Sequence, residues 1–264
     1  MDNINALKEK AEVVIHNIRE YFLRRGLLLN ANKTQCMFIG TPQYISKIPE
    51  DTVIKCNNEI IRPSHHVKNL GLHMDRHLTF GPHIDELCRT VSGILMYLNR
   101  IKDYFDEETR ILIVQSLVSS VINYCIKIWG TTNSLYLEKV QKIQNFAARV
   151  AVQGVRKYDH ITPTLKRLKW LRIKEKYKYE VGLFTFKVLN NKFPDWLYHF
   201  PNVGNIRVTL TRQNRDLFVK HHRTDLGSRS MLIRGPSHWN NLPRNVKDCL
   251  SFSLFKEKLK DAFL

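Results

Sequence analysis

Two short phrases near the N-terminus combine residue types that can meet a phosphate chain. LNANKTQCMFIG, residues 29–40, places Lys33 beside a turn at Asn30–Asn32 and ahead of a β-rich segment. HVKNLGLHMD, residues 66–75, places Gly71 inside a strand-like segment, where a glycine lets another chain approach the backbone closely. A positioned ammonium can stabilise negative charge that develops in a reaction. The plainer interpretations are a turn lysine at a strand edge and a β-bulge glycine.

A basic run interleaved with aromatic residues, LKRLKWLRIKEKYKYE, occupies residues 165–180. Its cations can contact phosphates while its aromatic rings stack on bases. The cations are Lys166, Arg167, Lys169, Arg172, Lys174, Lys176 and Lys178. The alternative interpretation, which we favour for most of the aromatic side chains, is the buried face of a basic-surfaced helix, made by Leu165, Leu168, Trp170, Leu171 and Tyr177. Under either interpretation the cations provide a surface for phosphates.

The distribution of charge points to the same kind of partner. The chain of 264 residues has a formal net charge of +18. Residues 161–264 hold 21 of the 42 Lys and Arg residues but only 8 of the 24 Asp and Glu residues. An excess this uneven predicts a polyanionic partner, and nucleic acid before a membrane surface.

Other kinds of site are not indicated by the residues. The five cysteines are widely spaced, which argues against a disulfide scaffold and a structural zinc site and favours an intracellular, reducing location in nucleus or cytoplasm. No Asp-Asp pair, phosphate-binding loop, zinc-protease motif or nucleophile elbow occurs. His73 and His77 have helical metal-ligand spacing, but their segment is predicted as strand and turn, so we interpret them as surface or nucleic-acid-facing residues. Acidic pairs such as Glu107 and Glu108 begin helices and are interpreted as capping charges.

The N-terminus, MDNINALKEK, lacks the apolar core of a secretion signal, so a secreted protein is not expected. The apolar stretch 111–129 is interrupted by Gln115, Asn123, Lys127 and serines. It is therefore expected to be a buried helix and not a membrane span.

Periodicity predicts an α+β fold in which an N-terminal helix with a small antiparallel sheet is followed by a mainly helical bundle and a basic mixed tail domain. The helix is expected at 3–25, with Gly26 as its stop, a hairpin at 52–55 and 59–62 around Asn57–Asn58, and a further strand at 67–74 broken at Gly71. The predicted domains are 1–80, 81–155 and 156–264.

Later elements are predicted from helical spacing and capping residues. Helices are expected at 83–102, at 107–128 after an Asp106 cap, at 135–152 after a Ser134 cap, and once or twice within 163–191. SMLIRGPSHWNNLP, residues 230–243, is expected to form a short strand, a Gly-Pro turn and one helical turn that ends at Pro243, with Trp239 packing between the strand and the final helix. That amphipathic helix should begin at Ser251 or Ser253.

The two opening phrases resemble segments of the reverse transcriptases of non-LTR retrotransposons, of jockey-like elements in particular. LNANKTQCMFIG is similar to the N-x-x-K-T segment behind the catalytic floor of the palm, and HVKNLGLHMDRHLTFGPHI is similar to the following segment, whose Leu-Gly turn is the primer grip before the thumb. Further similar phrases follow in the same order. They are INYCIKIWG, LEKVQKIQNFAARVA, LKWLRIKEK, GPSHWNNLP and FSLFKEKLK.

The resemblance implies roles for particular residues. Residues 1–80 would be a partial polymerase palm and the helices of 81–155 a thumb that follows a nucleic-acid duplex. Lys33 would be a general acid near the departing pyrophosphate, and Lys68, Leu70 and Gly71 would handle the primer. The nucleic-acid-binding cations of the basic run would be Lys166, Arg167, Lys169, Arg172, Lys174 and Lys176.

The resemblance also implies what the chain lacks. The palm aspartates that hold Mg²⁺ in the parent enzyme have no counterpart in this sequence, so we expect no cofactor and no polymerase activity for this chain alone. The leading interpretation is the C-terminal part of an RNA-directed DNA polymerase that keeps parts for handling RNA and DNA. The alternative is a non-enzymatic nucleic-acid-binding protein derived from a retrotransposon remnant.

Overall fold

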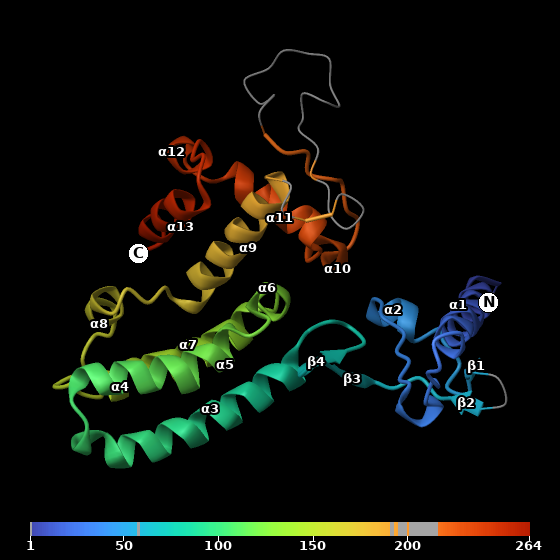
Figure 1. Cartoon of the computed structure of the whole chain (residues 1–264), viewed down its shortest axis with the longest axis horizontal. Helices are drawn as coiled ribbons and strands as arrows, with labels where there is room; N and C mark the ends of the chain where they lie inside the picture. Colours follow the sequence, from blue (N-terminus) through green and yellow to red (C-terminus); the bar gives the residue numbers. More distant parts are fainter. Residues whose placement is uncertain (1, 57–58, 191–192, 195–199, 201–215) are drawn as a thin grey trace. The chain divides into compact units, whose positions relative to one another are not determined.

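The computed structural model describes residues 2–56, 59–190, 193–194, 200 and 216–264. Its chain divides into two compact units, residues 1–83 and residues 84–264 (Figure 1). The described residues form many helices and two small antiparallel sheets, which confirms the coarse prediction of an α+β fold. The predicted domain boundary at residue 80 lies close to this division, whereas the predicted boundary at 155 falls within the second unit.

The first unit packs one long helix on short strands. Its elements are α1 (Asp2–Leu23), η1 (Ala31–Lys33), α2 (Pro42–Ile45), β1 (Ile54–Cys56), β2 (Glu59–Ile61), β3 (His66–Asn69) and β4 (Leu72–Asp75). The helix α1 lies against β1, where the Glu12 carboxylate accepts a hydrogen bond of 2.9 Å from the Lys55 amide. The chain leaves α1 through Gly26 at φ +71°, so the predicted helix and its stop are confirmed.

The strand predictions need correction. The two predicted arms at 52–62 do pair as β1 and β2, with Ile54 opposite Ile61, although Asn57–Asn58 lie outside the described residues. The predicted single strand at 67–74 is instead the hairpin β3–β4, in which Leu70 and Gly71 form the turn. Both turn residues have positive φ, +47° and +85°, and a turn of this kind matches the twist of paired strands. Gly71 is therefore a hairpin-turn glycine and not a bulge.

Two further details of the sheet differ from the prediction. The described strands form two separate two-stranded sheets and not one small sheet. In the β-rich segment at 34–39, only Cys36 pairs with another strand-like residue, through an isolated bridge to Pro63. The side chain of Thr34 instead donates to the Asn30 carbonyl at 2.9 Å, which keeps this segment in a local turn.

A buried carboxylate organises the exit from β4. Asp75, which is 6% exposed, accepts hydrogen bonds from the amides of His77 (3.0 Å), Thr79 (3.1 Å) and Phe80 (2.7 Å) and from the Thr79 hydroxyl (3.0 Å). Burial raises the pKa of Asp75, but the hydrogen bonds from Thr79, Phe80 and His77 outweigh it, so that its pKa lies below the ordinary value. These bonds stabilise a tight loop in which Leu78 and Phe80 have positive φ.

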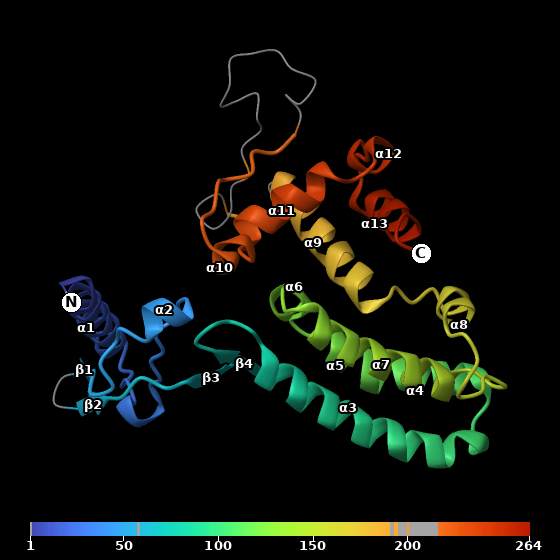
Figure 2. The ribbon, with the colours of Figure 1, turned by 180° about the vertical axis from the view of Figure 1, so that it is seen from behind.

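The second unit is helical in its described part. The chain enters it along α3 (Gly81–Ile101). The later elements are η2 (Lys102–Tyr104), α4 (Glu107–Val114), η3 (Gln115–Ser119), α5 (Ser120–Asn123), α6 (Ile126–Trp129), α7 (Ser134–Ala151), α8 (Thr162–Arg167), α9 (Ile173–Leu189), α10 (Asp225–Ser228), α11 (Met231–Asn240), α12 (Arg244–Lys247) and α13 (Phe252–Asp261). Figures 1 and 2 show α9 lying against α11 from both sides.

The predicted helix at 107–128 is interrupted. Its Asp106 cap is confirmed, because the carboxylate accepts from the Thr109 amide at 2.7 Å. The helix changes to a wider π turn in η3 and breaks at Cys125, which has φ +52°. The Trp129 indole donates to the Tyr124 carbonyl at 2.8 Å across the break. The cap of α7 is Asn133 and not Ser134.

The prediction that the stretch 111–129 is buried holds for one face, where Val114, Val118, Ile122, Ile126 and Trp129 lie in the core. It is wrong for the other face, where Leu112 and Leu117 are 63% and 49% exposed. Among the residues that the structure describes, no helix combines the length and apolarity needed to cross a bilayer.

The segment around GPSHWNNLP is helical, which corrects the predicted strand and Gly-Pro turn. Gly235 and Pro236 lie inside α11 and are buried. A Cβ atom on Gly235 would lie 2.9 Å from Phe200 Cζ and 3.1 Å from Thr185 Oγ1 of α9. The glycine therefore permits close packing of α11 on α9, and this packing overrides the local preference for a turn.

An aromatic cluster joins α9, α11 and α13. The rings of Phe186 and Phe255 stack with centroids 4.3 Å apart, and Trp239 lies 5.7 Å from Phe255. Trp239 thus packs against the final helix as predicted, although from a helix and not a strand. The final helix begins after a Ser251 cap, which accepts from the Leu254 amide at 3.2 Å.

We expect Asp75→Ala to destabilise the first unit by about 3 kcal/mol at neutral pH, since it removes a charged acceptor from several buried donors. The contribution of Asp75 is present above the ordinary pKa of an unfolded aspartate, about 4, and is lost as pH falls through the lower folded pKa. Hydrogen exchange of the β3 and β4 amides at neutral and acidic pH measures both effects. The exposed Asp51→Ala is the control, and equal protection in the two variants would contradict the prediction.

A second prediction compares two glycines of the second unit. Gly235→Ala should lower the free energy of unfolding by about 1–3 kcal/mol, because its methyl group would overlap Phe200 and Thr185. Gly93→Ala, in α3, should raise it by up to about 1 kcal/mol, because a Cβ atom there meets open space and alanine favours the helix. Denaturant unfolding curves provide the comparison, and changes of the same sign would refute the packing argument.

Candidate nucleic-acid interface

The basic run at 165–180 is divided between two helices. α8 ends at Arg167, and Lys169 takes φ +53° in the left-handed region that usually favours glycine. The amides of Lys169 and Trp170 then donate back to the carbonyls of Lys166 and Leu165, both at 2.9 Å, which closes α8 before α9 begins. Because the chain turns here, the cations of the run point to different surfaces.

The predicted cations consequently separate into groups. Lys169 and Lys176 line one cavity, whereas Arg172, Lys174 and Lys178 line another. Arg167 pairs with Glu107, and Lys166 is exposed. The interpretation of the apolar residues as core is confirmed for Leu165, Leu171 and Tyr177, which are at most 5% exposed. Trp170 is half-buried at the edge of the first cavity.

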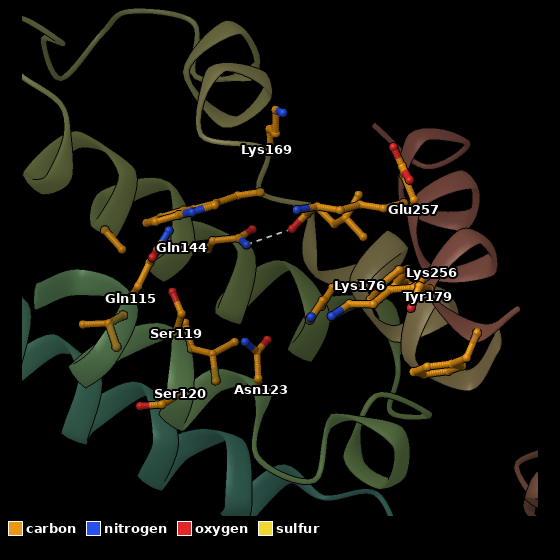
Figure 3. Close-up of a pocket in the computed structure, with 18 residues that line it drawn as sticks. Gln115, Ser119, Ser120, Asn123, Gln144, Lys169, Lys176, Tyr179, Lys256 and Glu257 are labelled. Carbon is orange, nitrogen blue, oxygen red and sulfur yellow. Dashed lines mark hydrogen bonds between the residues drawn. The ribbon is translucent and has the colours of Figure 1, made fainter. Parts of the chain in front are cut away.

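We call the first of these the lysine cavity, which has a volume of about 820 Å³ within the second unit (Figure 3). Its four lysines come from the α8–α9 connection, from α9 and from α13. They are Lys169, Lys176, Lys256 and Lys260. Neutral polar side chains from η3, α5 and α7 line the same space. They are Gln115, Ser119, Ser120, Asn123 and Gln144.

The lysines repel one another within this space. Burial lowers the pKa of Lys260, and the charges of Lys176, Lys169 and Lys256 lower it further, against an opposing effect of Asp261. Lys176 is partly compensated, since its ammonium lies 2.9 Å from a Glu180 carboxylate oxygen and 5.1 Å from the centre of the Tyr179 ring. Glu257 also lines the cavity. The balance of charge is positive and suits a polyanion.

The walls of the lysine cavity are fixed by buried groups. Gln144 Nε2 donates to the Leu171 carbonyl at 2.9 Å, which ties α7 to the start of α9 (Figure 3). Burial, together with the charge of Glu180, raises the pKa of Tyr179 to about 12, so this phenol stays neutral. Cations, amides, hydroxyls and the rings of Trp170 and Phe252 therefore surround one space. The cations can contact phosphates, the amides and hydroxyls can contact sugars and base edges, and the rings can stack on bases.

The remaining predicted residues lie on the first unit. Lys33 ends η1 with an exposed side chain, and its amide donates to Asn30 Oδ1 at 3.2 Å, as the turn interpretation expects. Lys68 is exposed on β3, and Leu70 is 85% exposed at the hairpin tip beside Gly71. The tip is therefore accessible to a partner, and the predicted primer-handling and general-acid roles stay predictions.

The histidines of the first unit show no metal-like arrangement. The His73 and His83 rings stack with centroids 6.4 Å apart. Burial, and then the charge of His73, lowers the pKa of His83 to about 4, so this ring is neutral at neutral pH. In the described part of the chain no three His, Cys, Asp or Glu side chains gather to hold a metal ion. The expectation about Mg²⁺ thus rests on the resemblance alone.

Several lining residues were not found from sequence. Gln115, Asn123 and the serines of η3 and α5 were treated as interruptions of an apolar stretch, and Gln144, Lys256 and Lys260 were not singled out. The available signal for the two lysines was their i, i+4 spacing on the side of α13 away from Phe255 and Leu259. Only the fold brings these two lysines to Lys169 and Lys176.

Comparison of the chain with protein-family models, with curated proteins and with solved structures gives no match.

We expect Lys260→Met to raise the free energy of unfolding by about 0.5 kcal/mol at low ionic strength in a buffer without multivalent anions, because it keeps the aliphatic stem and removes a repelled charge. Added salt should reduce this gain by screening the repulsion. The exposed Lys142→Met, outside the cavity, is the control for denaturant unfolding. A loss of stability in Lys260→Met alone would show that the lysines do not repel one another.

Proposed function

We propose that this chain binds RNA or DNA and that the lysine cavity contacts the phosphate backbone. The observation that carries the proposal is the convergence of Lys169, Lys176, Lys256 and Lys260, from separate segments, on one cavity. Burial, and then the charges of Lys176, Lys169 and Lys256, lower the pKa of Lys260, so keeping these like charges together costs stability in the free protein. A bound polyanion would offset that cost, so the clustered lysines suit a site that binds a polyanion.

The other groups of the cavity favour nucleic acid among polyanions. Gln115, Asn123 and Gln144 offer amide donors and acceptors, and Ser119 and Ser120 offer hydroxyls. Such groups suit sugars and base edges, whereas a purely charged partner would need only cations. The concentration of positive charge in residues 161–264 supports the same class of partner.

We further propose that the chain is the C-terminal part of an RNA-directed DNA polymerase similar to those of jockey-like non-LTR retrotransposons. The ordered set of similar phrases supports this proposal, with Lys33 and the exposed Leu70–Gly71 tip as its substrate-facing and primer-facing groups. Residues 1–80 then correspond to a partial palm and α3–α7 to a thumb. On its own the chain should not incorporate nucleotides, because the magnesium-binding aspartates of the parent enzyme have no counterpart in it.

The second candidate is a stand-alone nucleic-acid-binding protein derived from such a polymerase. The lysine cavity favours it specifically, since binding there needs no catalytic group. The in-frame coding sequence upstream of residue 1 separates the two candidates. An upstream segment with an Asp-Asp strand supports the polymerase.

For the binding function we expect the affinity for RNA or duplex DNA to fall steeply as salt rises. Replacing Lys169, Lys176 and Lys260 together by glutamine should lower the slope of log K against log salt by about 2–3 and weaken binding about ten- to a hundredfold at low salt. Fluorescence anisotropy over a salt series measures both quantities.

The matched control replaces three exposed lysines outside the cavity, Lys142, Lys157 and Lys220, so that the net charge of the two variants is equal. Equal weakening in the two variants would show that binding depends on the net charge of the chain and not on the lysine cavity. The proposal would be refuted if the unaltered chain did not bind nucleic acid at low salt, or if salt did not change its affinity.

A further inference from the structure

A second cavity lies on the other flank of α9, with a volume of about 550 Å³. We call it the Tyr177 cavity. Its walls are the segment after α6, the first half of α7, the first turns of α9 and the side of α11. All of these elements belong to the second unit, and its lining residues differ from those of the lysine cavity.

Two residues that line the Tyr177 cavity each have a buried polar atom without a hydrogen-bond partner in the described chain. These atoms are the hydroxyl of Tyr177, a residue that is 5% exposed, and Nε2 of His238. The two rings meet edge to face with centroids 5.7 Å apart. A buried polar atom without a partner is costly, and in a native protein it calls for a specific reason such as a bound ligand or water.

The charges around these atoms are mainly positive. Arg172, Lys174, Lys178 and Arg234 line the cavity against the carboxylates of Glu138 and Glu175. Arg234 Nε donates to the Ser228 carbonyl at 3.0 Å, which orients the guanidinium and leaves its terminal nitrogens available for an anion. At the start of α9 the Ile173 amide donates to Gln141 Oε1 at 2.8 Å. The other first-turn amides receive no side-chain cap from Arg172 and add partial positive charge at the same place.

The protonation states also suit an acceptor-rich ligand. Burial raises the pKa of Tyr177 against a smaller opposite effect of Arg234, so the phenol keeps its proton and can donate it. Burial, and then the charges of Arg234 and Lys178, lower the pKa of His238 to about 4. The imidazole is therefore neutral at neutral pH. A bound anion would offset those two cations and raise this pKa.

We infer that the Tyr177 cavity binds a phosphomonoester group, with Arg234 and Tyr177 donating to its oxygens and Arg172, Lys174 and Lys178 balancing its charge. A phosphomonoester suits this site better than a carboxylate, because its dianion has three acceptor oxygens for donors that come from both α9 and α11. The group can belong to a small phosphorylated molecule or to the terminal phosphate of a nucleic-acid strand. The inference does not depend on binding in the lysine cavity.

The experiment titrates the full chain with inorganic phosphate and with a nucleoside monophosphate by calorimetry. We expect Tyr177→Phe to weaken binding about three- to tenfold, the value of one hydrogen bond, and Arg234→Gln to weaken it more. Without ligand, Tyr177→Phe should melt at the same temperature as the unaltered chain or higher, since it removes an unpartnered hydroxyl and keeps the ring. Tyr158→Phe, at a residue that is 90% exposed, is the matched control and should bind as the unaltered chain does.

Oligonucleotides that end in a phosphate or in a hydroxyl distinguish the two sources of the group. They are compared in the triple glutamine variant of Lys169, Lys176 and Lys260, so that weak binding in the lysine cavity does not obscure the result. A preference for the phosphorylated end that Tyr177→Phe removes assigns the site to nucleic-acid ends. Binding of the nucleoside monophosphate without that preference assigns it to small molecules.

Two results would overturn the inference. One is the absence of binding of both phosphate and the nucleoside monophosphate, whatever the melting temperature of Tyr177→Phe; a lower melting temperature would then mean that the hydroxyl binds a structural water. The other is phosphate affinity that neither Tyr177→Phe nor Arg234→Gln changes. Neither result bears on salt-dependent binding of nucleic acid in the lysine cavity.

Discussion

The packing of α9 against its neighbours is the constraint on which the second unit depends. This helix contacts α6, α7, α11 and α13, and residues on several of its sides are buried. Glycines allow the neighbouring elements to pack closely against α9 on different sides. A Cβ atom on Gly182 would lie 2.9 Å from Leu259, and one on Gly130 would lie 2.5 Å from the Tyr177 ring. Because α9 is held on these sides, the backbone positions from which its side chains reach the two cavities are fixed.

The two cavities follow from the helical geometry of α9. Successive residues of a helix point about 100° apart, so Lys176 and Tyr179 lie on one flank while Tyr177 and Lys178 lie on the other. The aromatic cluster of Phe186, Trp239 and Phe255 stabilises the arrangement by burying large apolar surfaces. This apolar packing can offset the repulsion of lysines and the cost of unpartnered polar atoms, both of which lie at the margins of the core.

Local signals in the sequence were sufficient for much of the fold. Asp106 and Ser251 begin the helices that they were expected to begin, and Gly26 ends α1, since a cap and a left-handed stop depend on a few adjacent residues. The same logic failed where an unexpected residue took the same role. Lys169 ends α8 in the conformation that Gly26 adopts after α1, so the prediction of one or two helices within 163–191 did not locate the turn that divides the basic run.

Long-range packing accounts for the other errors. The Gly-Pro pair of α11 favours a turn by itself, but contact with Thr185 of α9 and with Phe200 makes a helix with a glycine at the crossing the better solution. The candidate site was predicted in part for a related reason. Lys169 and Lys176 belong to a basic run that the sequence shows, whereas Lys256 and Lys260 join the same cavity only because α13 packs on α9. Spacing along one helix cannot reveal a pairing between segments so far apart in the chain.

The two cavities differ in the kind of cation that they use, and this difference bears on what each can recognise. The cations of the lysine cavity are lysines, which are compact charges on flexible stems and can follow a phosphate chain whose path varies. The Tyr177 cavity adds Arg172 and Arg234 to its lysines, and the backbone carbonyl of Ser228 orients the Arg234 guanidinium. A planar guanidinium in a fixed orientation selects the geometry of one phosphate and not only its charge. The lysine cavity is therefore suited to affinity for a polymer, and the Tyr177 cavity to specificity for a single group.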